Sequence, residues 1–172
     1  MNILVTGASR GVGCEMVMQY AKNLSNNIVA LSRDIVALNE LKANCKKESN
    51  NSIHIYSIDF LSDTFGDDLD KVFNNHQTHF DIIINNAGLL INKPFSETTM
   101  LAIDSIYKVN VFSPITILQK AFTFLDKNKK CHVVNIGSMG GVQGSVKFPG
   151  LSIYSSSKAA LANLSECLAE EY

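Results

Sequence analysis

Three residues near the end of the chain could carry out acid–base chemistry on a carbonyl or an alcohol. Tyr154 and Lys158 are four apart in a segment with helical spacing, so their side chains would share one helix face. A free tyrosine has a pKa of about 10 and is a poor base at neutral pH, but a nearby ammonium stabilises the phenolate. Ser138 follows an apolar run and could hold a substrate oxygen. The alternative is that Tyr154 and Lys158 lie on an exposed helix face and that Ser138 is only a turn residue.

A glycine-rich segment after the first apolar run is typical of a phosphate-binding turn. The segment from Thr6 to Gly13 reads TGASRGVG and precedes a predicted helix. Glycines let the backbone approach a ligand closely, and the N–H groups and dipole of a helix start favour phosphate. The GxxxGxG spacing differs from the common GxGxxG fingerprint. A tight turn without a ligand is the alternative, but a place in the first β-α-β unit favours nucleotide binding.

The residues after the second predicted strand indicate which dinucleotide binds. An acidic side chain there would bond a free ribose 2′-hydroxyl, whereas an arginine accommodates a 2′-phosphate. Arg33 takes the first charged position, and Ser9 and Arg10 add a hydroxyl and a second guanidinium from the glycine-rich segment. We therefore expect NADP rather than NAD. Asp34 follows directly, either as a helix cap or as a residue that would favour NAD.

The elements that must position these residues alternate between strands and helices. Apolar runs predict five strands, at residues 3–6, 28–31, 53–58, 81–85 and 132–136. Helical spacing predicts helices at residues 11–24, 35–45, around 69–73, 98–125 with an irregularity at Pro114, and about 154–170; 46–52 is a predicted loop. Because the strands are apolar throughout, we expect a parallel sheet covered on both faces, a doubly wound α/β fold. Residues 1–172 would form one continuous domain.

The overall composition is that of an ordinary globular protein. The chain has 172 residues, 46% hydrophobic and 18% charged, and its net charge of −1 gives no general attraction to nucleic acid or to an acidic membrane. Four separated cysteines without a CxxC pair predict neither disulfides nor a thiolate metal site. We see no apolar run long enough to span a bilayer and no signal sequence. The expected location is therefore the cytoplasm, without metal, membrane or nucleic acid.

Five separated motifs resemble those of the short-chain dehydrogenase/reductase family, in its common Rossmann-like branch. They are TGASRGVG at 6–13, Asp59 after the third strand, NNAG at 85–88, Asn110 in the long helix, and Ser138 with YSSSK at 154–158. Their order makes the resemblance specific, and it covers essentially the whole chain. It implies an oxidoreductase that transfers a hydride between NADP(H) and a small-molecule carbonyl or secondary alcohol.

The resemblance also implies roles for individual residues. Tyr154 would be the general acid in reduction and the base in oxidation, and Lys158 would lower the tyrosine's pKa and bond the nicotinamide ribose. Ser138 would polarise the substrate carbonyl, and Asn110 would hold a water in a proton relay through Lys158. Asn86 could instead only brace the sheet. The implied cofactor-binding residues are Gly7, Ser9, Arg10, Gly11, Val12, Arg33, Asp59, Phe60, Asn86, Ala87, Gly88, Tyr154 and Lys158.

Two features depart from the family pattern. Ser138 and Tyr154 are farther apart than is usual, so we expect a longer loop over residues 140–151 at the substrate mouth. The chain stops at Tyr172, where members usually continue with further strands, so we expect a C-terminally truncated chain. The unprotected edge of the fifth strand favours this interpretation. Family members commonly form dimers or tetramers, which implies a homodimer or homotetramer.

Two other functions stay open at this point. One is an NAD-dependent dehydrogenase of the same family, and the other is a non-catalytic dinucleotide-binding protein or fragment. The complete set of Asn110, Ser138, Tyr154 and Lys158 argues against the second, whereas truncation argues for it. The substrate cannot be named from the sequence. Apolar residues that could line a pocket or belong to the core are Phe148, Leu151, Ile153 and residues 89–91.

Overall fold

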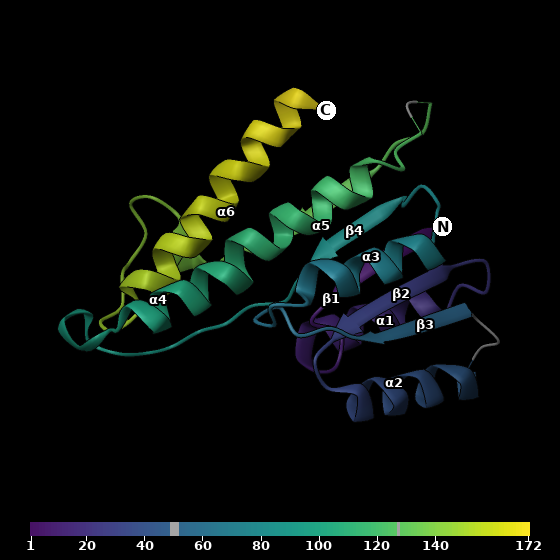
Figure 1. The fold of residues 1–172 in the computed structure, drawn as a ribbon, viewed down its shortest axis with the longest axis horizontal. Coiled ribbons are helices and arrows are strands. Elements are labelled where there is room, and N and C mark those ends of the chain that lie inside the picture. The colour runs from purple at the N-terminus through teal and green to yellow at the C-terminus, as the bar shows by residue number, and fades with distance from the viewer. Residues whose placement is uncertain (49–51, 127) are drawn as a thin grey trace. The chain divides into compact units, whose positions relative to one another are not determined.

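The computed structural model describes residues 1–48, 52–126 and 128–172, and its strands and helices alternate along the chain (Figure 1). The strands are β1 (Asn2–Thr6), β2 (Asn27–Ser32), β3 (Ser52–Ser57), β4 (Ile82–Asn85) and β5 (His132–Asn135). The α-helices are α1 (Gly11–Ala21), α2 (Ile35–Glu48), α3 (Phe65–Asn75), α4 (Met100–Tyr107), α5 (Ser113–Phe122) and α6 (Ser152–Glu171). The short turns are the 3-10 helices η1 (Phe95–Glu97) and η3 (Met139–Gly141) and the π-helix η2 (Lys108–Phe112).

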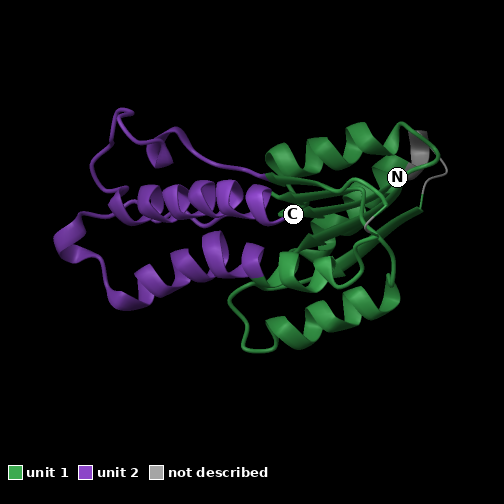
Figure 2. Cartoon of the chain, turned by 90° about the horizontal axis from the view of Figure 1, so that it is seen from above, with its two compact units in different colours: residues 1–87, 116–134 green, residues 88–115, 135–172 purple. Residues whose placement is uncertain are grey.

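The five strands form one sheet in the order β3-β2-β1-β4-β5. Strand β1 runs parallel to β2 and β4, and β2 runs parallel to β3. The apolar side chains of β1 and β2 are fully buried, as expected for strands covered on both faces. Figure 2 shows helices on both sides of these strands. The predicted doubly wound α/β fold is therefore confirmed.

The register of the sheet brings the ends of several strands into line. Thr6 of β1 pairs with Leu31 of β2, and Ser32 pairs with Ser57 of β3. The segments that follow these strands therefore share the carboxyl edge of the sheet. In an open α/β sheet, ligands bind at this edge where the strand order reverses, which here is between β1 and β4.

Several element boundaries differ from those predicted. Helix α1 ends at Ala21 rather than at residue 24, and α2 continues to Glu48, three residues into the predicted loop. The rest of that predicted loop includes residues 49–51, which lie outside the described residues. Asp34 does cap α2, because its Oδ1 accepts the N–H of Ala37 at 3.0 Å.

The predicted long helix over residues 98–125 is interrupted by the π-helix η2. The irregularity therefore lies over the turn before Pro114 rather than at the proline itself. Pro114 has no N–H to donate to the carbonyl of Asn110, four residues earlier, so a regular α-helical turn cannot close there. The N–H of Ser113 instead reaches the carbonyl of Lys108, five residues back.

The chain divides into two compact units (Figure 2). Unit 1 comprises residues 1–87 and 116–134 and holds nearly all of the sheet. Unit 2 comprises residues 88–115 and 135–172 and holds α4, η2, η3 and α6. The single domain over residues 1–172 stays a prediction.

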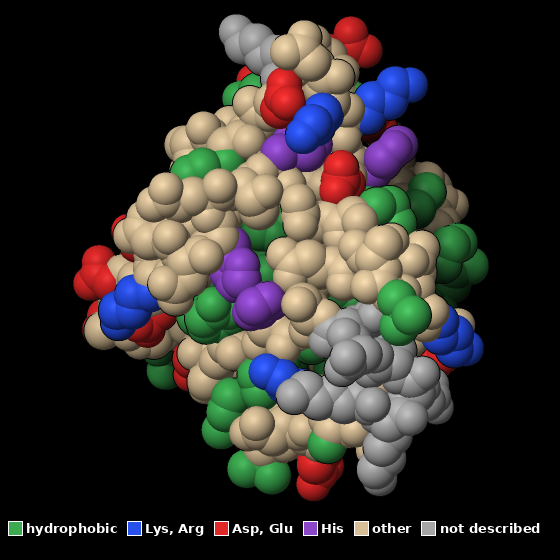
Figure 3. Space-filling model, turned by 90° about the vertical axis from the view of Figure 1, so that its right-hand side faces the viewer, with side chains coloured by type: hydrophobic (Ala, Val, Ile, Leu, Met, Phe, Trp, Pro, Cys, Tyr) green, Lys and Arg blue, Asp and Glu red, His purple; other side chains and the backbone are tan. Residues whose placement is uncertain are grey.

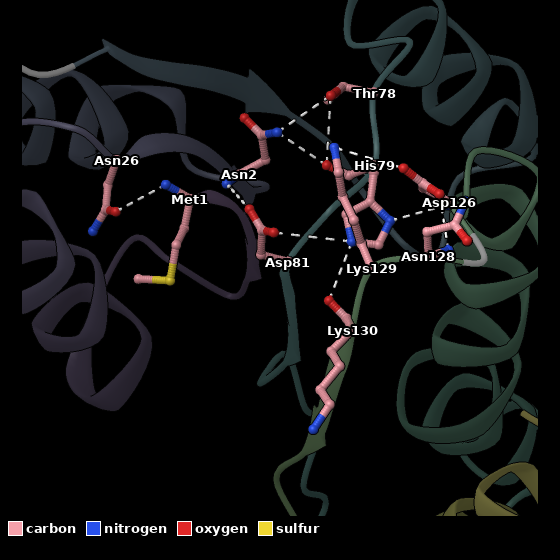
Figure 4. Close-up of polar contacts among 10 residues, drawn as sticks. All are labelled: Met1, Asn2, Asn26, Thr78, His79, Asp81, Asp126, Asn128, Lys129 and Lys130. Atoms are coloured by element: carbon pink, nitrogen blue, oxygen red, sulfur yellow. Dashed lines mark hydrogen bonds and ion pairs between the residues drawn. The ribbon is translucent and has the colours of Figure 1, made fainter.

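The amino edge of the sheet in unit 1 is closed by a polar network (Figure 4). Asp81 accepts the N–H of Asn2 at 2.7 Å, and the Asn2 amide donates to the carbonyl of His79 at 3.0 Å. Nδ1 of His79 lies 3.2 Å from the N–H of Asp126, and Nε2 lies 3.2 Å from the carbonyl of Lys130. This pairing requires the proton on Nε2 and the lone pair on Nδ1. The network ties the start of β1 to the segments before β4 and after α5.

One segment corrects an expectation about membranes. Residues Met100–Phe122 are long and apolar enough to cross a bilayer by length and composition, with 23 residues and a mean hydropathy of 1.2. The expectation that no run of this kind exists is therefore wrong. However, 44% of that window is buried inside the structure, and the core helix of a soluble protein passes the same test. The segment is weak grounds for a membrane assignment.

Candidate functional site

The glycine-rich loop of unit 1 has backbone positions that only glycine fits. Gly7 and Gly11 have positive φ angles of 65° and 56°. A Cβ at Gly7 would lie 2.8 Å from Cα of Ala87, and one at Gly13 would lie 2.4 Å from the carbonyl oxygen of Gly7. The loop therefore packs backbone to backbone on the segment after β4. The TGASRGVG and NNAG motifs are therefore in direct contact.

Thr6 and Asn86 make this contact specific. Oγ1 of Thr6 accepts the backbone N–H groups of Asn86 and Ala87, each at 3.0 Å. The side-chain amide of Asn86 donates to the carbonyls of Thr6 at 3.0 Å and Gly7 at 3.1 Å. Both side-chain amide hydrogens of Asn86 therefore bond to the glycine-rich loop. This agrees with the bracing role that the sequence offered as the alternative to cofactor binding. Thr6 was not among the predicted site residues, although a hydroxyl side chain at the end of a predicted strand could have indicated this contact.

The end of β2 is joined to both neighbouring segments. Oγ of Ser32 donates to Oγ of Ser9 at 2.7 Å, and Oγ of Ser57 donates to the carbonyl of Arg33 at 3.1 Å. Because Ser9 accepts this bond, its own hydroxyl hydrogen can be donated to a phosphate. The side chains of Arg10 and Arg33 are exposed. Unit 1 thus presents a hydroxyl and two guanidinium groups beside a glycine-rich helix start.

The segment after β3 completes this edge of unit 1. The N–H of Ile58 donates to the carbonyl of Ser32 at 2.9 Å, which holds the two strand ends together. Asp59 is exposed, and its Oδ1 accepts the N–H of Leu61 at 3.0 Å. The ring of Phe60 contacts the ring of Phe65, with centroids 5.3 Å apart. Asp59 and Phe60 are therefore positioned at the sheet edge, and their contact with adenine stays a prediction.

The helix α6 of unit 2 carries Tyr154 and Lys158 one turn apart, as predicted. Lys158 is 3% exposed, and its Nζ donates to the carbonyl of Ile136 at 2.7 Å. Burial lowers the pKa of Lys158 below its ordinary value, because desolvation disfavours the ammonium. An ammonium has three hydrogens, so two remain for other acceptors. Lys158 is therefore not part of an exposed helix face, and the catalytic role of the pair stays a prediction.

Ser138 caps the 3-10 turn η3 in the same unit. Its Oγ accepts the N–H of Gly140 at 3.3 Å, which leaves the hydroxyl hydrogen available for a carbonyl oxygen. A Cβ at Gly141 would lie 2.9 Å from the backbone N of Ala159. The turn that begins at Ser138 therefore packs directly on the part of α6 that carries Lys158.

Asn110 lies fully buried in the π-helix η2, so it is not a helix-surface amide. Its Oδ1 accepts the N–H of Leu89 at 2.7 Å. Its Nδ2 donates to the carbonyl of Leu89 at 2.9 Å and to Oγ of Ser157 at 3.0 Å. The side-chain amide thus joins the segment after β4 to α6, and its role in a proton relay stays a prediction. Gly88, the last residue of NNAG, is exposed and lies directly before Leu89 in unit 2.

An open parallel sheet with a glycine-rich first turn defines the Rossmann-like class of dinucleotide-binding folds. A family model described as short chain dehydrogenase matches residues 1–172. The chain therefore belongs to the short-chain dehydrogenase/reductase family.

Individual relatives agree with this assignment. L-xylulose reductase of Caenorhabditis elegans is 33% identical over 172 residues, covering 98% of this chain and 64% of that protein. NADPH-dependent 1-acyldihydroxyacetone phosphate reductase of Saccharomyces cerevisiae is 35% identical over 162 residues, covering 92% of this chain and 51% of that protein. A short chain dehydrogenase from Shigella flexneri 2a, solved with NADP, superposes with a TM-score of 0.88 at 28% identity, covering 99% of this chain and 71% of that one. The chain thus spans between one half and three quarters of these proteins.

Proposed function

We propose that the protein transfers a hydride between NADP(H) and a small-molecule carbonyl or secondary alcohol. The observation that carries this proposal is the arrangement in unit 2, where Lys158 is buried one turn from Tyr154 and Ser138 keeps a hydroxyl hydrogen to donate. When bound, the nicotinamide supplies the hydride in reduction and accepts it in oxidation.

The catalytic groups each have one task in the proposed reduction. Ser138 donates a hydrogen bond to the carbonyl oxygen and so polarises the carbonyl. Tyr154 gives its phenolic proton to that oxygen as the carbon accepts the hydride, which yields the alcohol and a phenolate. The ammonium of Lys158 stabilises this phenolate, and its two remaining hydrogens suit the hydroxyls of a ribose. In oxidation the phenolate takes the proton back.

The features of unit 1 support NADP as the cofactor. Substitution of Gly7 or Gly13 would place a Cβ against neighbouring backbone, so these glycines fix the conformation of the loop. The hydroxyl of Ser9 and the exposed guanidinium groups of Arg10 and Arg33 suit phosphate oxygens. The yeast relative is NADPH-dependent and the Shigella structure contains NADP, which supports the same preference. NAD is the less favoured cofactor.

The substitution Tyr154→Phe tests the mechanism. It removes the transferable proton and retains the ring, so we expect turnover to fall at least about 100-fold while NADPH binding is retained. Nicotinamide fluorescence measures binding, and loss of absorbance of NADPH in the presence of a ketone measures turnover. The matched control is Tyr107→Phe, which removes a phenol of the same unit that donates to Oγ of Ser156 at 3.1 Å. Full turnover by Tyr154→Phe would contradict the proposed role.

A non-catalytic dinucleotide-binding protein is the second candidate, because the features of unit 1 that suit a dinucleotide do not by themselves require a reaction. That function predicts NADPH binding without turnover of any carbonyl or alcohol. The proposed enzyme predicts both. Titrating the chain with NADPH and then adding ketones distinguishes the two.

A further inference from the structure

At Gly141, the turn η3 lies against α6 with no side chain between the two backbones. A Cβ at Gly141 would lie 2.9 Å from the backbone N of Ala159 and 2.9 Å from the carbonyl carbon of Lys158. Real Cβ atoms essentially never approach another heavy atom this closely, so any other residue here would push the turn away from the helix. The φ angle of Gly141 lies outside the left-handed region, so the contact, and not the backbone conformation, requires glycine.

The side chain of Lys158 contacts the same segment at both of its ends. A Cβ at Gly141 would lie 3.1 Å from Cβ of Lys158, and Nζ of Lys158 donates to the carbonyl of Ile136 at 2.7 Å. Ser138 lies between Ile136 and Gly141 in the chain, so the segment is held to α6 on both sides of this serine. These contacts help to bury Lys158, which is 3% exposed, and burial lowers its pKa.

Two neighbouring glycines lack this backbone contact. A Cβ at Gly140 would lie 2.6 Å from Oγ of Ser155, which is the outer atom of a short side chain and can rotate away. A Cβ at Gly137 would have no heavy atom of the described residues within 4 Å beyond its own chain neighbours. The glycines around Ser138 therefore differ in what a methyl group would meet, namely open space, a side chain or a helix backbone.

We infer that Gly141 is a positioning residue for the reaction. Its missing side chain lets the turn that begins at Ser138 rest on the backbone of α6, which fixes the Ser138 hydroxyl relative to the helix turn that carries Tyr154 and Lys158. This inference rests on the proposed function and deepens it. Polarisation of a carbonyl by one hydroxyl and proton transfer from another require both groups at the same oxygen, and a displacement of about 1 Å can cost about 100-fold in rate.

The first experiment compares Gly141→Ala with Gly137→Ala. The probe is whichever of butanone, cyclohexanone and acetophenone the unsubstituted protein reduces fastest with NADPH. Gly141→Ala should lower kcat by about 30-fold or more and leave KM within about 2-fold, because the lost interactions belong to the transition state. Gly137→Ala is the matched control, since its methyl group would meet open space beside the same serine, and it should keep kcat within about 2-fold.

A second variant displaces the turn from the α6 side, so the test does not depend on the folding of Gly141→Ala. Ser155→Leu places a larger side chain against Gly140 from a helix position that suits leucine, and kcat should fall by about 10-fold or more. Ser155→Ala only removes Oγ and should retain kcat. Ser156→Leu is the control for bulk, because the hydroxyl of Ser156 is exposed and accepts from Tyr107 instead.

A third readout does not depend on turnover. Lysines are acetylated with sulfosuccinimidyl acetate at several pH values and followed by peptide mass spectrometry, with the exposed Lys93 as the internal reference. In Gly141→Ala, labelling of Lys158 should quicken relative to Lys93, because the turn no longer covers its side chain. The midpoint of its pH dependence should also rise toward the ordinary lysine pKa of 10.5, because burial is lost.

The outcomes separate this inference from the proposed function. Unchanged kcat and unchanged labelling of Lys158 in Gly141→Ala would overturn the role of Gly141 and leave the proposed enzyme standing. A rise in KM without a fall in kcat, or equal losses in Gly137→Ala, would overturn it as well. If the unsubstituted protein reduced none of the ketones but Lys158 became exposed in Gly141→Ala, the result would contradict the proposed enzyme and support Gly141 as the residue that seats the turn on α6.

Discussion

Neighbouring serines of the YSSSK motif occupy opposite environments. Ser157 is fully buried, and its Oγ donates to the carbonyl of Tyr154 at 2.7 Å and accepts from Nδ2 of Asn110 at 3.0 Å. Ser156 is exposed, and its Oγ donates to the carbonyl of its own helix three residues earlier. Ser157 therefore connects the turn of α6 that carries Tyr154 to the buried amide of the π-helix η2.

The contrast between the two serines predicts the effect of removing each hydroxyl. Ser157→Ala leaves a buried amide hydrogen of Asn110 without its acceptor, which should lower the free energy of unfolding by about 1–3 kcal/mol. It should also lower kcat, because the turn that carries Tyr154 loses its link to Asn110. Urea unfolding and steady-state kinetics measure the two effects.

Ser156→Ala is the matched control for this prediction. It removes an exposed hydroxyl and should change the free energy of unfolding by less than about 0.5 kcal/mol. If Ser157→Ala and Ser156→Ala have the same free energy of unfolding and the same kcat, the proposed link between Ser157 and Asn110 has no effect on stability or turnover.

A histidine of strand β3, at the edge of the sheet, contacts a second histidine from the end of α3. The ring of His54 contacts the ring of His76, which follows α3, with centroids 4.5 Å apart. Nε2 of His76 lies 2.8 Å from the hydroxyl of Tyr56. Burial lowers the pKa of both imidazoles, the charge of Lys42 lowers that of His54 further, and His54 lowers that of His76. Histidine side chains are visible on the face of the molecule shown in Figure 3.

The lowered pKa values give unit 1 a defined pH dependence. As the pH falls below 6.5, the ordinary histidine value, the unfolded chain binds protons before the folded chain does. The free energy of unfolding should therefore fall with pH through the window between 6.5 and the lowered values. His54→Gln removes one of the two groups and relieves the other, so the slope between about pH 7 and about pH 5 should flatten.

Unfolding in urea at several pH values measures this slope. His132→Gln, at an exposed position of β5, controls for the loss of a histidine as such. A His54→Gln slope equal to that of the unsubstituted protein would show that the pair does not carry the dependence.

Cofactor binding acts on the stability of the whole chain. A ligand at 100 times its Kd adds about 2.7 kcal/mol to the free energy of unfolding. NADPH should therefore raise Tm more than NADH does at equal concentration. Arg33→Ala should remove most of this difference in Tm, because it removes a guanidinium proposed to bind the 2′-phosphate. Differential scanning calorimetry measures both shifts. The control is Lys22→Ala, which removes an exposed cation at the end of α1. If Arg33→Ala reduced the Tm shifts caused by NADPH and by NADH equally, the assignment of Arg33 to the 2′-phosphate would be ruled out.

Some whole-molecule properties stay predictions. We propose a homodimer or homotetramer, as is common among family members, and a cytoplasmic location, as the cysteine pattern predicts. The chain of 172 residues spans 64% of the L-xylulose reductase it matches. Activity and assembly are therefore proposals.

The sequence by itself determined the order of the strands and α-helices, the parallel sheet, and the candidate site motifs in each of the two units. The reason is that these features depend on local patterns. An apolar run predicts a buried strand, glycines at a strand end predict a tight turn, and residues four apart on a helix share a face. Pro114 signalled an irregular helix in the same way, through its missing N–H.

Only the tertiary structure decided which groups are the hydrogen-bond partners of these residues. Thr6 meets Asn86 across 80 positions of sequence, and Asn110 meets Ser157 across 47. Lys147 donates to the carbonyls of Gly140 and Val142 only because the loop folds back on itself. Side chains of one type are indistinguishable in sequence, and packing of distant segments determines which one is buried, which carbonyl it reaches and which apolar residue stays in water.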